Sequence, residues 1–164
     1  TYALCAEMLL LADAASDRDH ALRRISEVIR SGKAAQVMEN MIAAQGGNPK
    51  VVRDPSLMAA APHVVPVLAP RSGFVCEMDA LEMGLSAVML GAGRTRADQS
   101  VDPAVGIVLN AHLGEKVEKG SILAHVHVRD VQAAKPAMDR ILHAFKLGDE
   151  AKSPEPLVIE RIES

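Results

Sequence analysis

A cluster of prolines in the first half of this sequence divides it into two parts. Five of them, at positions 49, 55, 62, 66 and 70, stand within a stretch of 22 residues. Proline has no N–H and a fixed φ, so no long helix can run through this stretch. The residues before it have the period of helices, whereas from Gly73 onward the period changes to that of strands. We therefore predict a connector here, with a domain boundary between residues 62 and 63.

Three helices are expected before the connector. Leu4, Met8 and Leu11 recur at i, i+4 and i+7, which predicts one inward helix face. The second helix is expected to begin at Ser16 or Asp17 and to end at Gly32, and the third to cover residues 33–45. The apolar residues of these two helices that we expect to point inward are Ala21, Leu22, Ile25, Val28, Ile29, Val37, Met38, Met41 and Ile42.

Strand patterns dominate after the connector. We expect strands over 64–68, 74–78, 107–113, 121–128 and 157–162, with helices over 80–90 and 131–147. A turn from Gly114 to Gly120 joins the third and fourth strands. Alternation along the strands predicts one aliphatic core made of Val75, Ile107, Leu109, Ile122, Ala124, Val126 and Val128.

Composition excludes several classes of partner. Aromatic residues make up 2% of the chain, which argues against recognition of single-stranded nucleic acid by base stacking. A net charge of −3 provides no basic field for nucleic acid or an anionic membrane. No apolar run approaches the ~20 residues that span a bilayer. The two cysteines have no C-x-x-C spacing. We expect a cytoplasmic protein with no nucleic-acid and no membrane partner.

Several different short motifs follow one another in a fixed order along the chain. Those after the connector are Gly73-Phe-Val-Cys-Glu-Met-Asp79, Leu90-Gly-Ala-Gly-Arg94, Val101-Asp-Pro-Ala-Val-Gly106 and Gly114-Glu-Lys-Val-Glu-Lys-Gly120. Those before it are Cys5-Ala-Glu-Met-Leu9, Ser31-Gly-Lys-Ala34 and Ala43-Ala-Gln-Gly-Gly47. In this order and spacing the chain resembles the C-terminal part of the pyrimidine-nucleoside phosphorylase family, to which the thymidine phosphorylases belong. The resemblance implies an α+β fold, with helices of a large α/β lobe in residues 1–62 and a barrel-sandwich (α/β-hammerhead) domain in residues 63–164.

The resemblance also implies an enzyme, a pentosyltransferase. The family catalyses reversible phosphorolysis, in which inorganic phosphate displaces the base of a pyrimidine nucleoside at C1′; thymidine gives thymine and 2-deoxyribose 1-phosphate. Phosphate is a co-substrate, and no cofactor is implied. The implied partners are the α and α/β lobes of the rest of the phosphorylase chain and, at full length, a second subunit of a homodimer.

The family's reacting groups lie outside the matched part. Its phosphate is held by a Gly-rich segment with Lys, Ser and Thr, and its base by a His, an Arg, a Ser and a second Lys, all of which precede the part resembled here. We therefore assign no catalytic, substrate-binding or metal-binding residue, and expect a scaffold that is inactive alone. Preference for thymidine, uridine or a nucleotide depends on those other residues. The first residues already show the apolar pattern of a helix, and there is no initiator Met, so we expect an N-terminal truncation.

A second resemblance supplies the alternative function. The segments Gly106-Ile-Val108, Gly114-Glu-Lys-Val117 and Lys119-Gly-Ser-Ile-Leu123 resemble the second half of a lipoyl or biotinyl carrier domain. Such domains modify a Lys at a hairpin tip. The matching tip, residues 76–80, has Asp79 where the Lys is needed, so this alternative is a stand-alone barrel-sandwich binding module without the cofactor.

Four polar motifs are open to a functional interpretation. Leu90-Gly-Ala-Gly-Arg-Thr-Arg96 follows a helix, so we expect a C-cap complemented by the two arginines rather than a phosphate site. His125 and His127 share the outer face of a strand and could share a metal with His112, although surface histidines are the expectation. Glu77, Asp79 and Glu82 are expected to form a solvated turn, and Asp102 to set a turn before Pro103.

Overall fold

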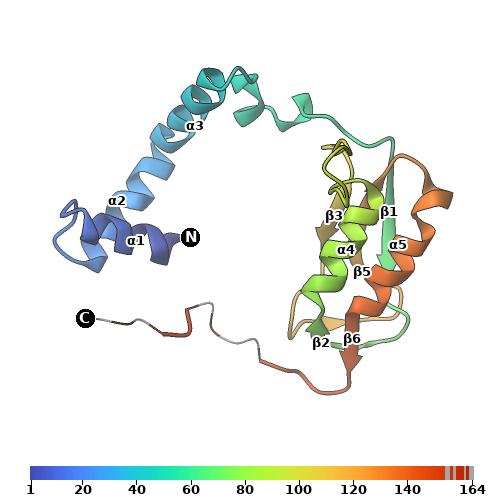
Figure 1. The fold of residues 1–164 in the computed structure, drawn as a ribbon. Coiled ribbons are helices and arrows are strands. Elements are labelled where there is room, and N and C mark those ends of the chain that lie inside the picture. The colour runs from blue at the N-terminus through green and yellow to red at the C-terminus, as the bar shows by residue number, and fades with distance from the viewer. Residues whose placement is uncertain (154–155, 157, 161, 163–164) are drawn as a thin grey trace. The chain divides into compact units, whose positions relative to one another are not determined.

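The computed structural model of the chain describes residues 1–153, 156, 158–160 and 162 (Figure 1). They fall into two compact units, residues 1–58 and 59–164. The first contains helices alone among its described elements, and the second combines helices with antiparallel strands. The predicted α+β class is therefore confirmed.

Unit 1 consists of three α-helices and two short 3-10 helices. Asp17 caps the second α-helix by accepting a hydrogen bond from His20 N at 2.8 Å, as the sequence predicted. Gly32, with φ of 76°, lies in the left-handed region between the second and third helices, a conformation that glycine adopts without strain. The elements are α1 (Tyr2–Leu11), α2 (Arg18–Arg30), α3 (Lys33–Ala44), η1 (Pro49–Val52) and η2 (Pro55–Leu57).

The faces that unit 1 buries match the predicted ones only in part: Ala21 and Ile25 of α2 are buried as predicted. Its small core joins Ala6 of α1 to Ala21 and Ile25 of α2. The residues predicted to face inward on α1 are exposed, with Leu11 at 87%. Helix α1 is apolar on nearly every side, so periodicity could not select its buried face. The other residues predicted inward but found exposed are Leu4, Met8, Val28, Ile29, Val37, Met38 and Met41.

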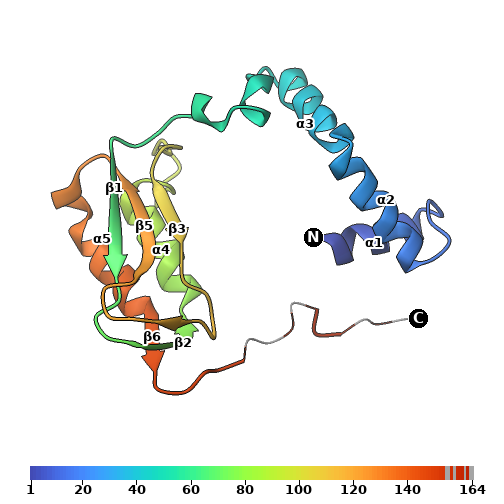
Figure 2. The same cartoon turned by 180° about the vertical axis from the view of Figure 1, so that it is seen from behind.

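The described residues of unit 2 form two three-stranded antiparallel sheets and two helices. One sheet has the order β1-β5-β3 and the other β4-β2-β6. Helices α4 and α5 lie side by side over one face of the first sheet, and Figure 2 shows the opposite face. The elements are β1 (His63–Leu68), β2 (Gly73–Met78), α4 (Ala80–Leu90), β3 (Gly106–Leu109), β4 (Lys116–Val117), β5 (Ile122–Val128), α5 (Val131–Ala144) and β6 (Phe145–Gly148).

Helix α5 ends earlier than the sequence predicted. The helix was expected to continue to residue 147, but it ends at Ala144 and the next residue begins β6. Strand β6 pairs with β2, and Phe145 lies opposite Met78. Pairing with a strand almost seventy residues away overrides the local helical pattern.

Two strand predictions also need correction. The strand expected over 107–113 ends at Leu109, and the turn Gly114–Gly120 contains the short strand β4, which pairs with β2. The strand expected over 157–162 falls partly on residues 157 and 161, which lie outside those described. The described residues 156, 158–160 and 162 are not in a strand.

The core of unit 2 is aliphatic, as expected, apart from Phe145. Val75, Ala124, Val126 and Val128 are buried and Ile107 packs against them. Leu109 and Ile122 were also predicted to be buried, but both are exposed.

A register shift explains why Leu123 is buried in place of Ile122. Val67 of β1 lies opposite Ala124, whereas the next residue, Leu68, lies opposite Ile122, so Leu123 is skipped. Such a bulge turns two consecutive side chains to one face. Leu123 therefore joins Ala124 in the core, fully buried.

Candidate functional site

The junction between β2 and α4 is where a carrier domain would present its lysine. Asp79 Oδ1 accepts hydrogen bonds from the N–H groups of Leu81 and Glu82, both at 3.0 Å, and so caps α4. The Asp79 N–H itself donates to the carbonyl of Ala144 at 3.0 Å. This segment is a strand-to-helix junction with a structural carboxylate, and residues 76–80 contain no Lys.

The other carboxylates of this region are engaged in ion pairs instead of forming a solvated turn. Glu77 accepts from Lys146 Nζ at 2.7 Å, and the carboxylate of Glu82 contacts the Arg140 guanidinium through two hydrogen bonds. These bonds raise the pKa of Lys146 and of Arg140 above their usual values. The pairs join β2 to β6 and α4 to α5. The acidic group therefore has a structural role.

The glycines after α4 form the expected C-cap. Gly91 has φ of 99°, and its N–H donates to the carbonyl of Val88 at 3.0 Å. Arg96 does not complement the helix end as predicted, because it pairs with Asp98 through two hydrogen bonds of 2.7 and 3.1 Å. Gln99 Oε1 accepts from the backbone of Thr95 at 2.8 Å and closes the turn. A guanidinium already paired with a carboxylate is a poor phosphate ligand.

Asp102 sets the turn at the far end of this loop, as predicted. Its Oδ1 accepts from the N–H of Ala104 at 3.0 Å, and its own N–H donates to the carbonyl of Gly91 at 2.9 Å. Asp102 also pairs with the Arg129 guanidinium through bonds of 2.7 and 3.1 Å. The bond from Arg129 lowers the pKa of Asp102 and raises that of Arg129. The sequence offered no signal for this ion pair.

We expect Asp102→Asn to destabilise unit 2 in a pH-dependent way. Because the pKa of Asp102 is lowered in the folded protein, its carboxylate stabilises the fold above the ordinary value of 3.8, and this contribution is lost as the pH falls through the folded pKa. Thermal midpoints of parent and variant should therefore differ near neutral pH and converge as the pH falls through the folded pKa, which lies below 3.8. Asp98→Asn, which breaks an exposed pair, should leave the midpoint unchanged. A difference that persists in acid would assign the effect to the turn hydrogen bond.

The histidines on β5 lie on the outer face, as predicted. His125 and His127 alternate with three buried residues of the strand. His112 lies instead in the turn before β4, where its Nδ1 is 3.6 Å from Glu115 Oε2. Across the part of the chain that the structure describes, no three His, Cys, Asp or Glu side chains are grouped to hold a metal ion. The three-histidine site is therefore not formed.

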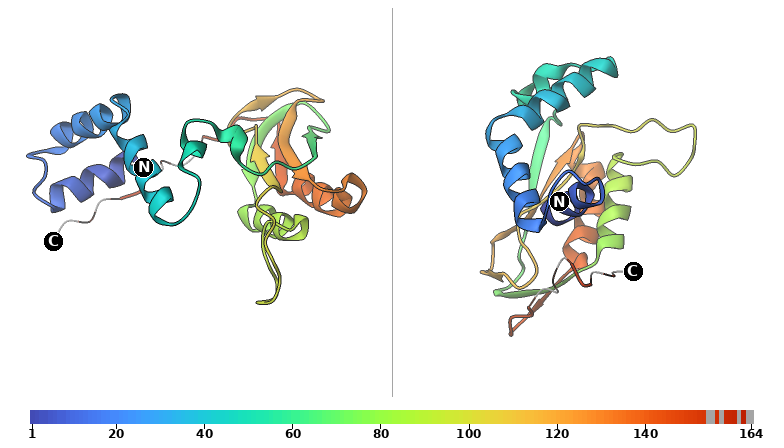
Figure 3. Two further views of the ribbon diagram at one scale, coloured as in Figure 1. Left: turned by 90° about the horizontal axis from the view of Figure 1, so that it is seen from above. Right: turned by 90° about the vertical axis from the view of Figure 1, so that its left-hand side faces the viewer.

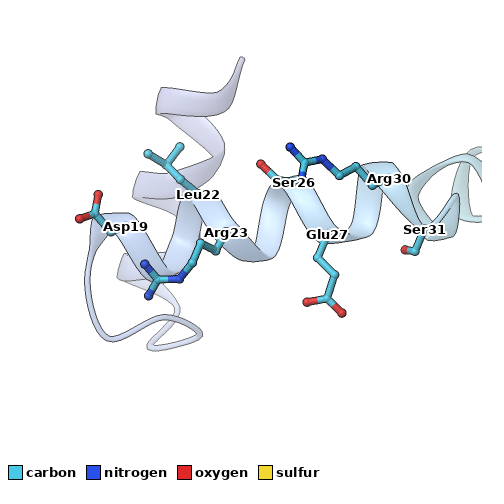
Figure 4. Close-up of a pocket in the computed structure, with 7 residues that line it drawn as sticks. All are labelled: Asp19, Leu22, Arg23, Ser26, Glu27, Arg30 and Ser31. Atoms are coloured by element: carbon cyan, nitrogen blue, oxygen red, sulfur yellow. The ribbon is translucent and has the colours of Figure 1, made fainter.

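Two hollows described in unit 1 do not assemble a reaction centre. One of about 750 Å³ lies along α2, and Figure 4 shows that its side chains leave the helix in different directions. Its lining residues are Asp19, Leu22, Arg23, Ser26, Glu27, Arg30 and Ser31. A second, of about 430 Å³ between α1 and α2, is mostly apolar and is lined by Cys5, Met8, Leu9, Ala12, Arg24, Ile25 and Val28. Neither places a nucleophile beside a base and an anion-binding group.

No helix among the residues described is both long and apolar enough to cross a membrane. Near the loops of unit 2, Arg71 pairs with Asp149, Arg96 with Asp98 and Arg129 with Asp102.

Comparison with known proteins identifies the family. The sequence model of the pyrimidine nucleoside phosphorylase C-terminal domain matches residues 74–157, about half of the chain. The thymidine phosphorylase of Burkholderia cenocepacia (strain HI2424) is 38% identical over 164 residues, which are 99% of this chain and 37% of that protein. The thymidine phosphorylase of Mesorhizobium japonicum is 36% identical over 163 residues, with the same coverage. The chain thus spans about 37% of the length of these relatives. It belongs to the pyrimidine nucleoside phosphorylase C-terminal domain family.

Proposed function

We propose that this chain is the C-terminal part of a thymidine phosphorylase, a pentosyltransferase that converts thymidine and phosphate to thymine and 2-deoxyribose 1-phosphate in the cytoplasm. One observation carries the proposal. Similarity to proteins named thymidine phosphorylase extends over 99% of the chain, through the helices of unit 1 as well as unit 2. A domain shared with unrelated enzymes would match in unit 2 alone.

Within that enzyme the chain serves as a scaffold. Phosphorolysis needs positioned cations for the phosphate, donors for the charge on the departing base, and exclusion of water. Five cations described in unit 2 are instead paired with carboxylates: Arg71, Arg96, Arg129, Arg140 and Lys146. Phosphate and nucleoside would therefore bind to residues outside this chain.

The domain organisation follows from the same proposal. Residues 1–62 would belong to a large α/β lobe, and residues 63–164 would form a barrel-sandwich domain whose two halves are the two three-stranded sheets. The exposed apolar side chains of α1 and α3, such as Leu4, Met8 and Val37, support a lobe that covers them. The partners are then the α and α/β lobes of the same enzyme and a second subunit.

A chimera tests this function. The chain replaces the corresponding 37% of the Burkholderia cenocepacia thymidine phosphorylase, and thymine release is measured with thymidine and phosphate as substrates. We expect turnover by the chimera, and none by the chain alone or by the relative without its replaced part. A folded but inactive chimera would refute the proposed function. Turnover by the chain alone, lost on mutation within it, would refute the scaffold role.

A further inference from the structure

Two imidazoles share the uncovered face of the β1-β5-β3 sheet. Strand β5 is central, and its residues Ala124, Val126 and Val128 face the core with at most 2% exposure. His125 and His127 therefore lie on the opposite face, which Figure 2 shows on the side of the sheet away from α4 and α5. Residues two apart on a strand are separated by about 6.6 Å, a spacing at which two imidazoles can reach one metal ion.

The surroundings of the two histidines leave room for such an ion. His125 lies between Pro66 of β1 and Val108 of β3, and His127 lies between Val64 and Gly106. All four cross-strand neighbours are uncharged, so neither a lysine nor a carboxylate competes for the rings. A Cβ added at Gly106 would meet nothing within 4 Å, which shows open space beside His127.

A hydrogen bond orients the His125 ring for metal binding. His125 Nδ1 lies 2.8 Å from Oδ1 of Asn110. With the amide oxygen as acceptor, this contact favours the tautomer that has the proton on Nδ1 and the lone pair on Nε2. Histidines that bind metals are usually held this way, with the second ring nitrogen donating to an oxygen that fixes the tautomer. His127 has no hydrogen-bond partner among the residues described, so its ring is also available.

We propose that His125 and His127 bind one divalent transition-metal ion, and that Asn110 is a positioning residue for this site. Imidazole ligands suit copper, nickel and zinc, whereas magnesium and calcium prefer oxygen ligands. Two protein ligands leave the remaining coordination positions to water. The site lies on a sheet face separate from the hollows of unit 1, and it does not depend on the phosphorolysis proposed above.

Calorimetric titration of the untagged chain with Cu²⁺, Ni²⁺ and Zn²⁺ tests the site, with Mg²⁺ as the negative control. We expect one ion per chain and the tightest binding for Cu²⁺. His125→Ala and His127→Ala should each weaken binding by more than Asn110→Ala does, for which we expect a loss of about tenfold. His63→Ala and His112→Ala, which remove exposed histidines elsewhere in unit 2, should leave the affinity unchanged.

The spectrum of bound Cu²⁺ gives a second readout. Electron paramagnetic resonance should show coupling to two imidazole nitrogens in the parent, and to one in each single histidine variant. Asn110→Ala should retain both couplings at reduced affinity, because that residue acts through His125 alone. Saturable binding that survives in His125→Ala/His127→Ala, or no saturable binding of any of the three ions to the parent, would overturn the proposal.

Discussion

Val126→Asp is expected to leave unit 2 unfolded. Val126 lies at the middle of the central strand β5, between Val65 of β1 and Ile107 of β3, and its exposed fraction is 0%. A carboxylate placed there has no cationic partner and would cost several kcal/mol, roughly, to bury. Domains of this size are stable by only about 5–15 kcal/mol. Circular dichroism should therefore show loss of the cooperative thermal transition.

The same substitution on the other face of the sheet is the control. Val108 of β3 is 51% exposed and lies opposite His125. Val108→Asp leaves the new carboxylate in water, so we expect a folded protein with a midpoint near that of the parent. A parent-like midpoint for Val126→Asp would mean that the strand register described here is wrong.

Leu123→Ala should be strongly destabilising, whereas Ile122→Ala should have little effect. Leu123 is fully buried and Ile122 is 40% exposed, although strict alternation assigns these two positions the other way round. Removing a buried leucine side chain costs about 2–5 kcal/mol, because apolar contacts are lost and a cavity remains. Urea unfolding of both variants measures the two free energies directly. The reverse order of effects would place the bulge elsewhere.

Elements whose boundaries depend on local contacts were predictable from the sequence. Helix α4 begins and ends where expected, because Asp79 caps residues only two and three positions ahead and Gly91 adopts the left-handed conformation immediately after the helix. The same holds for the start of α2 at Asp17. In each case the residue type and its position contain the necessary information.

Features that depend on distant parts of the chain were not predictable. Residues 145–148 continue a helical pattern, yet they pair with β2. The bulge at Leu123 arises from the pairing of β5 with β1, which alternation within β5 alone does not reveal. The face of α1 was missed because its sequence is apolar on nearly every side. The ion pair of Asp102 with Arg129 joins residues 27 positions apart.

The proposed histidine site also combines a feature that was predictable from the sequence with features that were not. Alternation placed His125 and His127 on one outer face, which the structure confirms. The contact of His125 with Asn110 could not be foreseen, because it depends on the register between β5 and β3. The predicted approach of His112 failed for a related reason, since β3 ends at Leu109 and the chain turns away before residue 112.

Because the Asp102 N–H donates a hydrogen bond to the carbonyl of Gly91, the loop between these two residues should tolerate insertions. Figure 3 shows this loop projecting from unit 2, and the bond holds its two ends together at 2.9 Å. With the ends fixed, and Arg129 anchoring Asp102 to the end of β5, doubling the loop costs only about 0.6 kcal/mol of closure entropy. Insertions between residues 92 and 101 would leave the sheets undisturbed, so a peptide tag or a reporter domain can be spliced there.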